Sequence, residues 1–412
     1  MNYDSLRINA QRLKDSLLEL SKIGGTKTDG VHRLALTDED RKARDLLLDW
    51  LRKAEMDVAV DEVGNIFGRR EGKNKGLSPV MSGSHIDTQP KGGKFDGSYG
   101  VIGALEVART LNDYDVETDR SFEVVSWTNE EGTRFAPPLI GSGVYVGEFT
   151  LDYAYSRLDK EGKAFGDELK RINYQGTTPC SARDIHAYLE MHIEQGPILE
   201  VEKKTIGLVK GIFGIVWLDV ALKGQSNQAG PTPMNMRRDP LVAAADMIRA
   251  IRNIPSRVGG DLVSTVGSID VQPNSRNTIP GEVRFTVDFR SAKSETLDKA
   301  LELLNLEIEY ASKRECVEAD VKQIWRIPYT PFSKNCIETI ETSIKKLGYD
   351  YLSMTSGAGH DAKYLADICN TGMIFVPSIG GRSHCEEETT DWKDIEAGCN
   401  VLLHSILKLV ST

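Results

Sequence analysis

The feature of this sequence that most constrains its fold is a change in the order of secondary-structure patterns along the chain. Residues 79–83 and 121–127 are apolar runs typical of buried strands, and residues 99–111 between them have a helical pattern. Such alternation predicts an α/β domain with helices covering a sheet. From residue 215 the order becomes strand, helix, strand, strand, helix, strand. That βαββαβ order predicts a ferredoxin-like α+β module.

The module is expected to interrupt the first domain. Its elements are predicted at residues 215–222, 240–252, 264–271, 282–290, 293–312 and 316–325. A strand at 373–377 and an amphipathic helix at 391–410 follow it. The 412 residues exceed the limit of roughly 250–300 for one hydrophobic core. We therefore expect a discontinuous catalytic domain, residues 1–213 plus 329–412, and an inserted domain, residues 214–328.

Composition excludes several classes of protein. The net charge is −10 and no block of Lys and Arg interrupts the acidic chain, so a nucleic-acid partner is not expected. No apolar run approaches the ~20 residues of a membrane span, and residues 1–20 have an amphipathic helical pattern rather than that of a signal peptide. Six scattered cysteines indicate reduced thiols and a cytoplasmic location. Partners are expected to be small molecules or a second copy.

Chemically active side chains follow the predicted strands of the α/β part. In open α/β sheets, binding sites lie beyond the carboxyl ends of strands. One motif, Ser84-His85-Ile86-Asp87, occurs at such a position, and an adjacent pair of glutamates follows the next strand. The residues that could together bind two divalent cations are His85, Asp96, Glu131, His192 and His384.

Each of these residues alone has an ordinary explanation. A single histidine in a loop is usually a surface or capping residue, Asp96 before Gly97 suits a turn, and Glu130-Glu131 would commonly be a solvated pair. Their joint occurrence at successive strand ends, in glycine-rich loops, favours a metal site. Such ligands accept Zn, Mn, Co or Ni.

The adjacent glutamates predict a division of roles. Glu131 would bind metal, while the unligated Glu130 would take a proton from the attacking water and pass it to the leaving nitrogen. Asp87, two residues after His85, would accept the second N–H of that imidazole and fix its tautomer. The alternative for Asp87 is an ordinary turn carboxylate.

Four motifs together resemble a known family. They are Gly83-Ser84-His85-Ile86-Asp87, Gly93-Lys94-Phe95-Asp96-Gly97, Asn129-Glu130-Glu131-Gly132 and His192-Ile193-Glu194-Gln195-Gly196-Pro197. They resemble the amidase, hydantoinase/carbamoylase branch of the dinuclear zinc exopeptidases. That branch contains N-carbamoyl-L-amino-acid hydrolases, allantoate amidohydrolases and yeast-type β-ureidopropionases. The resemblance extends from about Leu36 to the last predicted helix.

The resemblance implies a fold and a role for each matching residue. It implies a zinc-exopeptidase-like catalytic domain with an inserted dimerisation and lid domain, two divalent ions per subunit and a homodimer. Asp96 would bridge the ions, with His85 and His192 on one ion and Glu131 and His384 on the other. Glu130 matches the general base. The residues that match substrate-binding positions are Gln195, Asn277 and Arg290, together with His360 and the neighbouring Gly359 in a loop lining the pocket.

One position departs from the family pattern. Within Asn227-Gln228-Ala229-Gly230, glutamine stands where the family has a histidine that stabilises the oxyanion, typically in the partner subunit's site. A glutamine amide still donates a hydrogen bond but carries no positive charge, and losing an oxyanion donor can cost about 10²–10³ in turnover. The substitution is natural or engineered, and the sequence is compatible with both.

The expected activity is hydrolysis of the ureido C–N bond of N-carbamoyl-L-amino acids. Hydrolysis of allantoate, ureidoglycolate or N-carbamoyl-β-alanine is the nearest alternative. A peptidase or deacylase is disfavoured by His192, because those relatives usually have a carboxylate at that position. An inactive metal-binding homologue is the alternative outside enzymes.

Overall fold

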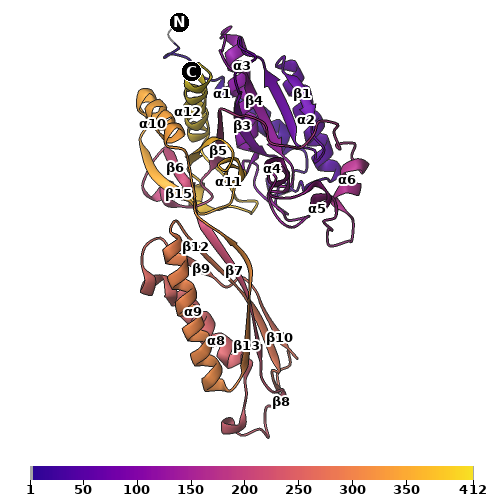
Figure 1. Ribbon diagram of the computed structural model, residues 1–412, viewed down its shortest axis with the longest axis vertical. Helices are drawn as coiled ribbons and strands as arrows, with labels where there is room; N and C mark the ends of the chain where they lie inside the picture. The colour runs from indigo at the N-terminus through magenta and orange to yellow at the C-terminus, as the bar shows by residue number, and fades with distance from the viewer. Residues whose placement is uncertain (1–2, 412) are drawn as a thin grey trace. The chain divides into compact units, whose positions relative to one another are not determined.

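The computed structural model describes residues 3–411, and they form two compact units (Figure 1). The first unit extends to Gly211 and resumes at Pro331, and the second unit is Ile212–Thr330. The boundaries expected from the sequence, 213/214 and 328/329, each lie two residues from these positions.

The first unit contains a nine-stranded mixed sheet with the order β1-β2-β4-β3-β5-β16-β6-β14, and β15 pairs with β6. Its strands are β1 (Asp57–Val60), β2 (Ile66–Arg70), β3 (Val80–His85), β4 (Phe122–Trp127), β5 (Ala187–Ile193), β6 (Ile206–Ile212), β14 (Thr330–Pro331), β15 (Tyr351–Ser356) and β16 (Asn370–Val376). The four central strands β4, β3, β5 and β16 are parallel. Their carboxyl ends therefore lie at one edge of the sheet.

Helices cover this sheet and close the main core. They are α1 (Ala10–Ser21), α2 (Asp38–Lys53), α3 (Ser98–Asp113), α4 (Ile140–Val146), α5 (Leu151–Tyr155), α6 (Phe165–Arg171), α7 (Ile198–Val201), α10 (Lys334–Leu347), α11 (Ala362–Leu365), the 3₁₀ turn η2 (Ile379–Gly381) and α12 (Trp392–Val410). Helices α3 and α12 pack on the central strands and on each other. The apolar side chains between these layers, such as Leu105, Met191 and Leu402, are fully buried.

The second unit has a five-stranded antiparallel sheet with the order β10-β12-β7-β13, and β9 also pairs with β12. Its elements are β7 (Gly214–Lys223), β8 (Asn227–Gln228), η1 (Met234–Met236), α8 (Pro240–Val258), β9 (Val263–Thr265), β10 (Ile269–Gln272), β11 (Thr278–Ile279), β12 (Glu282–Ser291), α9 (Ser294–Glu315) and β13 (Glu318–Ile327). Helices α8 and α9 bury alternate side chains of the sheet, among them Val283, Phe285 and Phe289. The unit therefore has its own hydrophobic core.

Two local expectations differ from the structure. The strand expected at 264–271 is two short strands, β9 and β10, both paired with β12 and interrupted around Gly267. The first helix begins only at Ala10, where the Asn9 side chain accepts a hydrogen bond from the Arg12 backbone N–H. Although apolar and polar residues alternate along β5, the strand lies between β3 and β16 and every residue in it is buried.

No helix among residues 3–411 is long and apolar enough to cross a membrane. All six cysteines are free thiols.

Candidate metal centre

The parallel strands deliver the candidate ligands to one edge of the sheet. His85 is the last residue of β3, and His192 is the second-last residue of β5. Glu130 and Glu131 follow β4 by three and four residues. His384 lies in the loop that follows β16. Because these strands are parallel neighbours, segments far apart in the sequence meet at their carboxyl ends.

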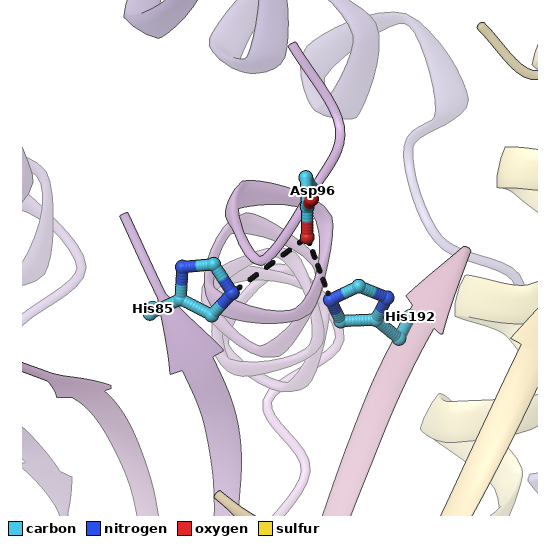
Figure 2. A group of neighbouring side chains, drawn as sticks. All are labelled: His85, Asp96 and His192. Atoms are coloured by element: carbon cyan, nitrogen blue, oxygen red, sulfur yellow. Dashed lines mark ion pairs between the residues drawn. The ribbon is translucent and has the colours of Figure 1, made fainter. Parts of the chain in front are cut away.

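The first group of ligands is His85, Asp96 and His192 (Figure 2). The Nε2 atoms of His85 and His192 lie 3.7 and 3.2 Å from Asp96 Oδ1. The other nitrogen of each ring, Nδ1, hydrogen-bonds to a backbone carbonyl oxygen. His85 Nδ1 lies 2.9 Å from Asp87 O, and His192 Nδ1 lies 2.9 Å from Ile193 O. A carbonyl only accepts, so Nδ1 carries the proton and the Nε2 lone pair faces Asp96.

The second group is Asp96, Glu131 and His384, whose ligand atoms also lie within 4.8 Å of one another. His384 Nε2 is 3.6 Å from both Asp96 Oδ2 and Glu131 Oε2. Asp96 thus directs one oxygen toward each group, which is the geometry of a carboxylate shared by two cations. Burial opposes ionisation of Asp96, but the neighbouring imidazoles, with His192 the nearest, outweigh it and lower the pKa of Asp96.

The two adjacent glutamates differ in their contacts. Glu131 receives hydrogen bonds from the backbone N–H and the side-chain amide of Gln89, which direct it toward His384. Glu130 Oε2 lies 3.4 Å from His85 Nε2. Burial raises the pKa of both well above the usual value, with Asp361 adding to the effect on Glu130 and Asp96 to that on Glu131. Positive ions at the centre would favour the charged forms.

The role expected for the Asp87 carboxylate needs correction. Its backbone carbonyl, not its side chain, accepts from His85 Nδ1, and the nearest carboxylate oxygen is 3.9 Å from that nitrogen. The carboxylate instead accepts from the backbone N–H groups of Glu130 and Glu131, at 3.3 and 3.4 Å. Burial, followed by the charge of Asp40, raises the Asp87 pKa to about 7. Asp87 therefore holds the loop that carries the glutamates.

Three other expected site residues lie in the first unit. Gln195 Nε2 donates to Asp96 Oδ2 and to Ser383 Oγ, both at 3.1 Å. The ring of His360 packs 4.5 Å from the ring of His192, and burial lowers its pKa well below the usual value. Gly359 precedes it, with open space where a side chain would project. Gln195 and His360 thus contact ligands of the centre, and Gly359 lies in the loop that carries His360.

The remaining expected residues lie in the second unit. Gln228 is in β8 and pairs with Thr278 of β11, next to Asn277. Arg290 is near the end of β12, opposite Ile215, and pairs with Asp288 at 2.8 Å. Gln228 and Asn277 are therefore close to each other at a separate two-stranded sheet, β8 with β11, which follows the Lys223 end of β7, whereas Arg290 lies at the other end of β12.

Two residues around the centre were not found from sequence. Gln89 binds Glu131, and Glu388 accepts hydrogen bonds from the backbone N–H groups of Asp96 and His384. Burial, followed by the charge of Asp96, raises the Glu388 pKa to about 8. Glu388 is the third of three consecutive glutamates, and local sequence has no signal that selects it from the half-buried Glu386 and the exposed Glu387.

The donor set fits divalent cations. Two buried imidazole lone pairs and the carboxylates of Asp96 and Glu131 converge, and His384 adds a third nitrogen. Asp96, Glu130 and Glu388 are buried near Glu131, and this accumulation of negative charge is unfavourable unless cations offset it. A parallel-sheet edge with this ligand set and a free glutamate beside it defines a metal-dependent hydrolase.

Comparison with known proteins shows which family of metal-dependent hydrolases this chain belongs to. The model of peptidase family M20/M25/M40 matches residues 81–408, and the chain belongs to that family, whose members depend on metal. The resemblance to the hydantoinase/carbamoylase branch is confirmed.

Individual relatives cover nearly the whole chain. An N-carbamoyl-L-amino-acid amidohydrolase of Rhizobium meliloti is 43% identical over 98% of this chain and 97% of its own length. An allantoate amidohydrolase of Bacillus subtilis is 32% identical over 96% and 97%. The crystal structure of an amidase of the hydantoinase/carbamoylase family from Burkholderia multivorans has a TM-score of 0.94 and 46% identity, covering 99% of each chain.

Proposed function

We propose that this protein hydrolyses the ureido C–N bond of N-carbamoyl-L-amino acids and releases the amino acid, carbon dioxide and ammonia. The observation that carries this proposal is the position of Asp96 between two groups of ligands, with Glu130 unligated beside them. The 43% identity to an N-carbamoyl-L-amino-acid amidohydrolase supports the substrate class.

The centre is proposed to hold two divalent ions, Zn or one of Mn, Co and Ni, since histidine and carboxylate ligands accept all four. His85 and His192 would hold one, Glu131 and His384 the other, and Asp96 both. Bound ions would lower the pKa of an attacking water toward ~7 and polarise the carbonyl of the substrate.

Glu130 is proposed as the general base. It is buried and lies beside the first ligand group, with Oε2 3.4 Å from His85 Nε2. Its raised pKa suits a group that accepts a proton from water and then delivers it to the leaving nitrogen.

Gln195 is proposed to bind the ureido group. Its Nε2 is engaged by Asp96 and Ser383, while its Oε1 is buried and has no hydrogen-bond partner among residues 3–411. A buried carbonyl oxygen without a donor is costly unless a ligand supplies one. The N–H groups of a carbamoyl substrate are donors of the required kind. His360 would line the same pocket through its packing on His192.

The second unit is proposed to be a ferredoxin-like dimerisation and lid domain. Arg290 would hold the carboxylate of the substrate in a charge-assisted fork when that domain closes. Its partner Asp288 is itself only partly buried and would be displaced.

Geometry within the second unit supports a homodimer. Along β12, eight residues separate Arg290 from Glu282, the strand end nearest Gln228 and Asn277, so about 26 Å lies between these sites at ~3.3 Å per residue. One small substrate cannot contact Arg290 and also Gln228 and Asn277 across this distance. If all three residues bind substrate, Gln228 and Asn277 must act on the site of a second copy. There the Gln228 amide would donate to the developing oxyanion.

Allantoate is the second candidate substrate, favoured by the relative in Bacillus subtilis. Ureidoglycolate and N-carbamoyl-β-alanine would require the same centre and a differently shaped pocket. A cytoplasmic location is proposed from the six free cysteines.

The deciding experiment is ammonia release from a panel of N-carbamoyl-L-amino acids, allantoate, ureidoglycolate and N-carbamoyl-β-alanine. The metal-free protein would be reconstituted separately with Zn²⁺, Mn²⁺, Co²⁺ and Ni²⁺. Turnover highest on N-carbamoyl-L-amino acids supports the proposal. Turnover confined to acyl amides or peptides, or metal binding with no turnover on any ureido compound, would refute it.

A further inference from the structure

We propose that Glu388 is a positioning residue that presets the ligands of the second cation by tying the His384 loop to the Asp96 loop. This inference rests on the two-ion centre of the proposed function. It adds the residue that holds the ligands of the second ion in position.

His384 needs such a support more than the other histidines do. His85 and His192 are each 1% exposed, and a backbone carbonyl holds each ring. The His384 side chain is 51% exposed. Apart from the two carboxylates that would share its ion, its ring has no polar partner among residues 3–411. Its backbone has a φ of +55°, which is rare outside glycine. The loop, not the ring environment, must therefore set its position.

Glu388 supplies the connection through both of its oxygens. Oε1 accepts from the backbone N–H of Asp96 at 3.2 Å. Oε2 accepts from Ser383 Oγ at 3.0 Å and from the backbone N–H of His384 at 3.3 Å. One buried carboxylate thus connects two ligands that are 288 positions apart in the sequence (384 minus 96), through their backbone N–H groups. Ligand supports of this kind typically change metal affinity by 10–100-fold.

A second observation concerns Gly93, in the loop before Asp96. A Cβ at this position would overlap the carboxylate and Cβ of Glu388. The backbone of the Asp96 loop therefore packs directly on the Glu388 side chain. That contact restricts the positions available to the Glu388 carboxylate.

The test is titration of the metal-free full-length protein with Co²⁺, followed by calorimetry, for wild type and Glu388→Gln. An amide retains only one acceptor oxygen, so its NH₂ must face N–H donors on one of the two sides. We expect the first ion to bind as in wild type, because His85 and His192 keep their own supports. The second ion should bind about 10–100-fold more weakly.

Two further variants test whether the effect is specific to the Glu388 carboxylate. Glu387→Gln changes an exposed neighbour in the same loop and should bind both ions as wild type does. Gly93→Ala leaves the Glu388 carboxylate intact but displaces it, and should also weaken the second ion selectively. If Glu388→Gln failed to fold, Gly93→Ala would carry the test, with thermal unfolding of the metal-free protein as the folding control.

The outcomes separate this proposal from the proposed function. Unchanged affinity for the second ion in Glu388→Gln, or equal weakening of both ions, would overturn the positioning role. A wild-type protein that binds one ion would overturn both the role and the two-ion centre. Selective loss of the second ion in a protein that releases no ammonia from ureido compounds would support the role and refute only the activity.

Discussion

Replacement of Gly97 by alanine tests the geometry of the centre most directly. Gly97 precedes helix α3 with φ +61° and ψ −47°, and its backbone N–H lies 3.1 Å from His192 Nε2. A Cβ at this position would overlap three atoms of the His85 ring. These contacts would be far inside the ~3.5–4.0 Å separation of unbonded carbon atoms. The ring cannot swing away freely, because it is buried and held by Asp87 O.

Two costs add in this variant. A non-glycine residue at this sparsely populated φ and ψ costs about 1–3 kcal/mol. Forcing an additional carbon into a packed site costs typically about 1–3 kcal/mol more. We therefore expect the metal-free protein to lose about 2–6 kcal/mol of stability. The displaced His85 Nε2 should also weaken the first ion, because ligand atoms must hold metal distances to about 0.2 Å.

Urea unfolding followed by tryptophan fluorescence would measure the stability, and elemental analysis after dialysis would measure the bound metal. Gly348→Ala is the matched control: Gly348 ends α10 at φ +75° and has no atom within 4 Å of an added Cβ. It should lose only the backbone cost of about 1–2 kcal/mol and keep its metal. If Gly97→Ala unfolded at the same urea concentration as Gly348→Ala and held as much metal, the packing of Gly97 on His85 would be refuted.

Three further predictions concern catalysis and pH. Glu130→Gln should keep its metal content while kcat falls about 10²–10⁴-fold, and near-normal turnover would remove Glu130 from the base role. Arg290→Ala should raise KM about 10–100-fold for ureido substrates with a carboxylate, since charge-assisted hydrogen bonds contribute about 1.5–3 kcal/mol, and equal loss on substrates without that group would contradict the assignment. Burial raises the pKa of Asp61 from 3.8 to about 6, so the protonated acid is favoured in the folded state, and the associated stability is complete below pH 3.8 and lost as the pH rises through about 6. The stability of wild type relative to Asp61→Asn in urea should therefore fall by roughly 2 kcal/mol from pH 4 to pH 7, and a constant difference would disprove the shift.

The sequence was most informative where function depends on local order. His85 and the two glutamates were expected beyond strand ends, and the carboxyl ends of parallel β3 and β4 do carry them to one edge. This could be predicted because apolar runs mark buried strands, and the carboxyl ends of parallel strands necessarily coincide. The α/β fold and the family followed from the same motifs and are confirmed.

Other features escaped prediction because local pattern is ambiguous about them. The alternation in β5 would suit a strand with one solvated face, yet both faces are buried, since the order of strands in a sheet is a long-range property. The strand expected at 264–271 divides around Gly267, where its pairing with β12 is interrupted. Asp87 was expected to reach His85 through its carboxylate, but only the folded loop determines that its carbonyl is closer.

By itself the sequence determined where strands and helices form, which residue types are available for metal chemistry, and which family they match. Only the tertiary structure decided which of Glu386, Glu387 and Glu388 is buried between two ligand loops, and which oxygen of Asp96 faces each group. The physical reason is that hydrophobic periodicity is encoded between near neighbours. The direction of a polar side chain, in contrast, depends on partners hundreds of residues away, which sequence spacing does not specify.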